Sequence, residues 1–178
     1  CRRTYRKRIT QMTSPKVSIL MGSDSDADRL QPCFDHLKKM GIPFEAKVRS
    51  AHRTPAALVT YLIEAEAAGV EVFLCAAGGA AHLAGVVAAH TLKPVMGIPM
   101  DNAPLGGLDA LLATVQMPSG IPVATVAVGG GGPANAALFA ARILALSDTE
   151  LAGRLVEFRQ EMANKVEAKD AALQARLA

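Results

Sequence analysis

The sequence predicts an α/β protein: a three-layer αβα sandwich built on a parallel five-stranded sheet, with an extra helix at its C-terminal end. Short apolar runs alternate five times with longer segments of helical spacing. This alternation is typical of a parallel sheet that is covered by helices on both faces. Right-handed crossovers then distribute the helices over the two sides of the sheet.

In the first half of the chain, glycine and proline mark the boundaries of the expected elements. A strand at 17–21 is a short apolar run that ends in Gly22, and a helix at 24–40 stops at Gly41. A more polar extended run follows at 44–49. The next helix, at 55–68, has Pro55 in its first turn and Gly69 after its end.

The second half repeats the same unit three times. Apolar runs predict strands at 70–77, 95–98 and 123–128, and the segments after them predict helices at 80–90, 108–116 and 133–146. A last, charged helix is expected from about residue 149 to the end. It carries one apolar stripe at steps of three and four: Leu151, Leu155, Phe158 and Met162. Such a stripe packs either on a partner subunit or on the helix's own domain.

Composition fits one domain, which we expect over residues 12–178. The chain has 178 residues, 51% of them hydrophobic but only 4% aromatic and none Trp. The core should therefore consist of Ala, Val, Leu, Ile and Met. No apolar run reaches the length of about 18 residues that a transmembrane helix needs, so we expect no membrane partner.

The net charge of +3 depends entirely on the first residues. Five basic residues and no acidic ones lie within residues 1–11, which we interpret as a disordered basic tail or as residues upstream of a natural start at Met12. The remainder has a slight acidic excess, so we expect no nucleic-acid partner. The three cysteines form no CxxC pair, which suits a reducing, cytoplasmic location.

Ligands of such sheets bind beyond the carboxyl ends of the strands, so the strand-to-helix loops are the candidate site. The first loop reads Gly22-Ser23-Asp24-Ser25-Asp26. Ser23 and Ser25 at a helix start can bind a phosphate, and a carboxylate remains for a sugar diol. The alternative is plain helix capping, for which Ser and Asp are the preferred residues.

The second and third loops add histidines. The second reads Ser50-Ala51-His52-Arg53-Thr54-Pro55. Arg53 can grip a phosphate and His52 can pass a proton near neutral pH, although a surface loop is the alternative interpretation. The third, Ala77-Gly78-Gly79-Ala80-Ala81-His82, allows backbone to approach a ligand closely, or is simply a tight turn.

Other motifs are weak or missing. The GxGxxA-like run that begins at Gly129 lies in the last unit, with no later strand to place an acid on a ribose. The sequence contains no GK[ST] and no GxSxG, and no residue cluster has metal-ligand spacing, so we expect no cofactor and no metal. His36 and His90 are expected in solvated or capping roles. The residues thus predict a flavodoxin-like sandwich with a phosphate-and-histidine pocket, but not a reaction.

Taken together, the loops resemble the PurE family from about Lys16 to Leu146. The matching stretches are the first loop, the second loop, Gly78-Gly79-Ala80-Ala81-His82-Leu83, and the run from Val115 to Val123 that contains Gln116-Met117-Pro118-Ser119-Gly120. His52-Arg53-Thr54 and the third loop resemble class I, the N5-carboxyaminoimidazole ribonucleotide mutases of purine synthesis. These are isomerases that move a carboxyl group from N5 to C4 by decarboxylation and recapture of CO2.

The resemblance implies a role for each site residue. Ser23 and Arg53 would hold the substrate phosphate with support from Ser25 and Ser50, and Asp26 would hold the ribose. His52 would be the proton shuttle. The base and carboxylate pocket would be walled by Gly78, Gly79, Ala80 and His82. The resemblance also implies a homo-octamer and a reaction without metal, biotin or ATP.

Three positions depart from the family pattern: Ala27 replaces a common Trp, Ala76 a Gly and Ala84 a Pro. None is a proposed catalytic residue. Three other functions stay open: direct carboxylation of aminoimidazole ribonucleotide with CO2, a carboxylase of nickel-pincer cofactor synthesis, and a non-catalytic flavodoxin-like nucleotide-binding module. The nickel-pincer enzymes are longer and have an additional domain.

Overall fold

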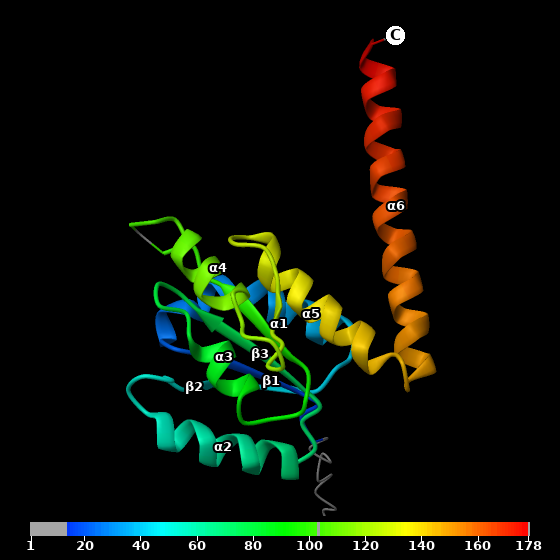
Figure 1. Ribbon diagram of the computed structural model, residues 1–178. Helices are drawn as coiled ribbons and strands as arrows, with labels where there is room; N and C mark the ends of the chain where they lie inside the picture. Colours follow the sequence, from blue (N-terminus) through cyan, green and yellow to red (C-terminus); the bar gives the residue numbers. More distant parts are fainter. Residues whose placement is uncertain (1–13, 103, 178) are drawn as a thin grey trace, which may run out of the picture.

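A single sheet of five parallel strands forms the centre of the molecule (Figure 1). The computed structural model describes residues 14–102 and 104–177. The strand order is β2-β1-β3-β4-β5. The strands are β1 (Val17–Met21), β2 (Phe44–Val48), β3 (Val72–Ala77), β4 (Val95–Pro99) and β5 (Ala124–Thr125). The predicted five-stranded parallel sheet is therefore confirmed.

Helices cover both faces of the sheet. They are α1 (Gln31–Lys39), α2 (Pro55–Ala67), α3 (Leu83–Ala88), α4 (Leu108–Val115), α5 (Gly131–Leu144) and α6 (Thr149–Leu177). One apolar cluster joins the sheet to α1 and α5, and a second joins the other face to α2 and α3. The predicted three layers result from these two cores. No described helix is both long and apolar enough to cross a membrane.

The cores are aliphatic, as the composition predicts. Phe73 on β3 is the largest fully buried side chain, and most other core positions are Leu, Ile, Val, Met or Ala. Helix α5 buries four alanines, Ala136, Ala137, Ala140 and Ala141. Small side chains on that face let α5 lie close to α1 and to the sheet.

Three elements differ from their predicted ranges by three residues or more at one end. The helix expected at 24–40 is divided into two 3₁₀ turns, η1 (Asp24–Asp26) and η2 (Asp28–Leu30), before α1 begins at Gln31. Pro32 explains the division, because proline fits the first turn of an α-helix but cannot continue one from the preceding turn. The helix expected at 80–90 starts only at Leu83, and β5 pairs with β4 over two residues.

The last helix begins where the sequence predicts, and the start of its stripe packs on its own domain. Leu151 is buried, and Leu155 and Phe158 pack against the α1–α5 core. Met162 is 44% exposed, and beyond it α6 extends away from the sheet (Figure 1). The predicted basic tail, residues 1–11, lies outside the described residues.

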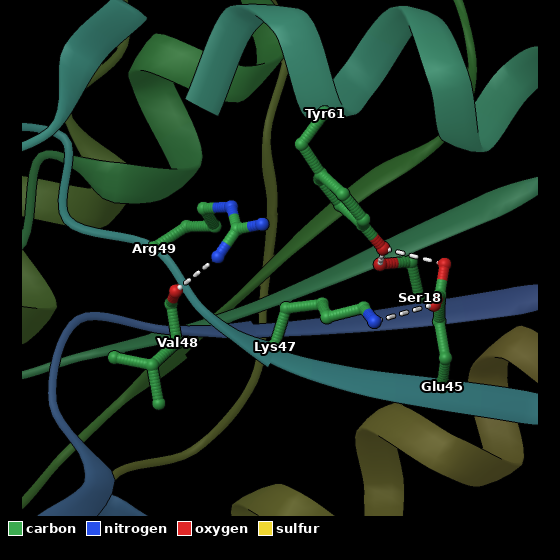
Figure 2. A network of polar contacts seen from close by, with 6 residues as sticks. All are labelled: Ser18, Glu45, Lys47, Val48, Arg49 and Tyr61. Atoms are coloured by element: carbon green, nitrogen blue, oxygen red, sulfur yellow. Dashed lines mark hydrogen bonds and ion pairs between the residues drawn. The ribbon is translucent and has the colours of Figure 1, made fainter. Parts of the chain in front are cut away.

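A buried polar network joins α2 to strands β1 and β2 (Figure 2). The hydroxyl groups of Tyr61 on α2 and Ser18 on β1 lie 2.5 Å apart, and Tyr61 donates to Glu45 Oε1 on β2 at 2.7 Å. The Arg49 guanidinium lies 5.2 Å from the centre of the Tyr61 ring. Because Arg49 immediately precedes the second loop, its contact with the Tyr61 ring joins the start of that loop to α2.

We expect Tyr61→Phe to lower the free energy of unfolding by about 1–3 kcal/mol, because the buried Ser18 hydroxyl would lose its partner. Urea unfolding measures the change. The double variant Ser18→Ala/Tyr61→Phe is the control, since removing both hydroxyls should cost less than the sum of the two single variants. Additive losses would contradict a coupled network.

Candidate active site

A cavity of about 180 Å³ opens at the carboxyl ends of four neighbouring strands. The first three strand-to-helix loops supply most of its wall, and the loop after β4 supplies one residue. The lining residues are Gly22, Ser23, Ser25, Asp26, Ser50, Ala51, His52, Arg53, Ala77, Gly78, Ala80, Leu83 and Asn102. The cavity therefore brings together eight of the ten predicted site residues.

The first loop both caps its helix and leaves polar groups in the cavity. Ser23 accepts a hydrogen bond from the backbone N–H of Ser25 at 3.4 Å and another from the Ser25 hydroxyl at 3.0 Å. The capping interpretation is thus correct for Ser23. It does not account for the second serine or for Asp26, which also line the cavity.

The second loop forms hydrogen bonds within itself and to the first loop. The Ser50 hydroxyl accepts the backbone N–H of Arg53 at 3.1 Å, and the Thr54 hydroxyl donates to the Ser50 carbonyl at 3.1 Å. Arg53 Nη2 donates to the carbonyl of Gly22 at 3.4 Å. A guanidinium has five donors, so this one bond leaves most of them available to a phosphate beside Ser23 and Ser25.

His52 and His82 form a direct pair. His52 Nε2 and His82 Nδ1 lie 3.0 Å apart, with the two rings nearly perpendicular at 82°. One ring must donate and the other accept, so the tautomers of the two rings are linked. His52 lines the cavity, whereas His82 and Gly79 are not among its lining residues. His82 therefore contacts the candidate proton shuttle rather than the cavity, which differs from the predicted wall position.

Asp26 is a buried carboxylate. The residue is only 5% exposed. Burial raises the pKa of its carboxyl group above the ordinary value, and the nearby Arg29 guanidinium partly opposes this shift. Among the described residues no side chain donates a hydrogen bond to the carboxylate, which leaves it free to accept hydroxyl groups of a ligand.

Asn102 is the lining residue that sequence reasoning missed. It follows β4 by three residues, in the connection between the strand predicted at 95–98 and the helix predicted at 108–116, where the sequence has no recognisable motif. Its amide lies against Gly78: a Cβ atom on Gly78 would be 2.0 Å from Asn102 Nδ2. The described residues contain no group of three or more His, Cys, Asp or Glu side chains placed to hold a metal ion.

The chain matches a known protein family over most of its length. A family model described as AIR carboxylase matches residues 16–165. The chain belongs to the AIR carboxylase family. The predicted PurE resemblance is thereby confirmed, and the match spans every loop that lines the cavity.

Individual members of the AIR carboxylase family are similar over nearly their whole length. The N5-carboxyaminoimidazole ribonucleotide mutase of Saccharolobus solfataricus is 50% identical over 152 residues, which are 85% of this chain and 95% of that protein. The protein of the same name from Mycobacterium leprae is 49% identical over 160 residues, 90% of this chain and 92% of its own length. The crystal structure of Treponema denticola PurE has a TM-score of 0.82 at 34% identity and covers 89% of this chain and 98% of its own.

We expect Asp26→Asn to be more stable than wild type at neutral pH. The folded state holds the Asp26 proton more tightly than the unfolded state does, so stability falls as the pH rises from the unfolded pKa of 3.8 through the raised folded pKa. An amide avoids this cost. Thermal unfolding should show a higher Tm for the variant at pH 7 and a narrowing difference as the pH is lowered towards about 4.

The matched control is Asp170→Asn, which changes an exposed carboxylate on α6 and should not alter Tm appreciably. A variant at position 26 that is less stable than wild type at pH 7 would contradict the account of this carboxylate.

Proposed function

We propose that the chain is an isomerase of purine synthesis that converts N5-carboxyaminoimidazole ribonucleotide into 4-carboxy-5-aminoimidazole ribonucleotide. The observation that carries the proposal is the placement of His52 within a cavity that also presents Ser23, Ser25 and Arg53. Relatives about 50% identical over most of the chain are named for this reaction.

The cavity suits a ribonucleotide in one orientation. The phosphate binds between Arg53 and the three serines Ser23, Ser25 and Ser50, where a guanidinium, hydroxyl groups and the N-terminal end of a turn converge. The Asp26 carboxylate accepts the ribose hydroxyl groups. The aminoimidazole base then lies beside His52, against the wall that Gly78 and Ala80 of the third loop form.

The reaction needs a proton carrier and a place to keep CO2. When the N5–carboxyl bond breaks, CO2 leaves and N5 gains a proton. C4 then attacks the carbon of the same CO2, and the C4 proton must leave to restore the aromatic ring. The proton gained at N5 and the proton lost at C4 cancel, so one group that returns to its starting state is sufficient. His52 takes this role, and its bond to His82 orients the ring.

Retention of CO2 replaces a bimolecular capture by a local one. No step of this scheme requires metal, biotin or ATP.

The assembly and the location are also part of the proposal. We expect a homo-octamer, from the PurE resemblance and from the length of α6 that extends beyond its own domain (Figure 1). We expect the enzyme to act in the cytoplasm, where purine synthesis supplies its substrate.

We expect His52→Asn to bind the ribonucleotide but to lose turnover by about 10²–10⁴-fold, the usual contribution of a general acid–base group. Asn keeps a hydrogen-bonding group near His82 but cannot shuttle a proton. The measurement is the rate of 4-carboxy product formation from N5-carboxyaminoimidazole ribonucleotide, alongside calorimetric binding of 5-aminoimidazole ribonucleotide.

His90→Asn is the control, because His90 is an exposed histidine that bonds the Val86 carbonyl. It should keep wild-type turnover. Turnover of His52→Asn within about threefold of wild type would remove His52 from the proposed role, and wild-type protein without isomerase activity would contradict the proposed function itself.

A further inference from the structure

We infer that Asn102 is a further substrate-contacting residue whose amide N–H groups bind the migrating carboxyl group, and that Arg29 is the positioning residue that holds this amide. The inference rests on the proposed function and adds a specificity-determining contact to it. Neither residue belongs to the motifs that identified the site.

The Asn102 amide lies on the wall of the cavity that Gly78 forms. A Cβ on Gly78 would be 2.0 Å from Asn102 Nδ2 and 2.9 Å from its Cγ. A side chain at position 78 would therefore meet the Asn102 amide, which would have to move away from this wall. The amide nitrogen lies directly over the backbone that the base and its carboxyl group are proposed to approach.

The direction in which the amide points follows from its partner. Arg29 Nη1 donates a hydrogen bond to Asn102 Oδ1. An arginine side chain has donors only, so the oxygen of the amide must face Arg29 and the NH₂ group must face the other way. The Asp101 carboxylate, 3.2 Å from the same Nη1, holds the guanidinium in turn.

The chemistry of the surrounding wall selects the ligand group. Among the residues that line the cavity, Ala77, Gly78, Ala80 and Leu83 offer no side-chain hydrogen-bond donor, so Asn102 is the side-chain donor on this wall. The serines and Arg53 lie on the first two loops. A donor suits carboxylate or CO2 oxygens, which only accept. Ribose hydroxyl groups instead find an acceptor in Asp26.

A donor at this point is useful throughout the reaction. Carboxyl oxygens are present on N5 in the substrate, in free CO2 between the two half-reactions, and on C4 in the product. A neutral NH₂ group can hold an oxygen in each state. It also adds no positive charge, which would favour the carboxylates over the uncharged CO2.

The test compares two ribonucleotides that differ by one carboxylate. Calorimetry measures binding of 4-carboxy-5-aminoimidazole ribonucleotide and of 5-aminoimidazole ribonucleotide, which lacks it. We expect Asn102→Ala to weaken binding of the carboxylated ligand about tenfold or more, as loss of a hydrogen bond to a charged group does. The affinity for the ligand without the carboxylate should change less than about twofold. Asn102→Asp should weaken binding of the carboxylated ligand further. Asp keeps the shape of the side chain and the bond to Arg29, but it replaces the NH₂ donor by a negatively charged oxygen.

Arg29→Met tests the positioning role. It should weaken binding of the carboxylated ligand less than Asn102→Ala does. Binding of the other ligand should weaken still less, through Asp26, whose pKa Arg29 lowers. Asn164→Ala, which alters an exposed amide on α6, is the control and should bind both ligands as wild type does.

If the wild-type protein binds both ribonucleotides, two results would overturn the inference. One is an equal loss of affinity for the two ligands in the Asn102 variants, and the other is no loss of affinity in either variant. Failure of the wild-type protein to bind either ribonucleotide would instead overturn the proposed function, and the inference with it. Asn102→Asp decides the question if Asn102→Ala does not fold.

Discussion

The parallel direction of all five strands is the constraint on which the site depends. Because every strand runs the same way, each strand-to-helix loop leaves the sheet at the same edge. Residues from positions 22 to 102 meet there although they come from four separate loops. The two apolar cores pack helices on both faces of the sheet, and the Tyr61–Ser18–Glu45 network joins α2 to β1 and β2. The chemistry of the site is thus determined by where the strands end.

Bonds between loops complete the arrangement. Arg53 bonds the carbonyl of Gly22, and His52 bonds His82 on the following loop. Arg29 connects the turn after the first loop to Asn102 after β4. Each bond holds a functional group in place before a ligand arrives, which lowers the entropy cost of reaching the reactive geometry. Asp26, in contrast, lowers the stability of the fold at neutral pH, because burial of its carboxylate disfavours the charged form.

Local sequence signals were sufficient for most of the fold, and they failed where tertiary context decides. Apolar runs located β1, β3 and β4, because these central strands are buried on both faces. The edge strand β2 is partly exposed and was predicted from a more polar extended run. Pro32 divided the first helix, and periodicity alone did not show this. The stripe on α6 was recognised, but whether it packs on its own domain depends on the crossing of α5 and α6. In the site, motifs placed the serines, His52 and Arg53 at one cavity. Asn102 was missed because its partner Arg29 is 73 residues away in the sequence.

The most direct test of the account is whether CO2 stays in the cavity between the two half-reactions. Unlabelled N5-carboxyaminoimidazole ribonucleotide is supplied in buffer that contains ¹³C-bicarbonate and carbonic anhydrase, and the early 4-carboxy product is analysed by mass spectrometry. Internal transfer predicts product that is mostly unlabelled. Product labelled to the level of the solvent pool, with turnover that rises in proportion to added CO2, would show direct carboxylation and contradict the proposed isomerase.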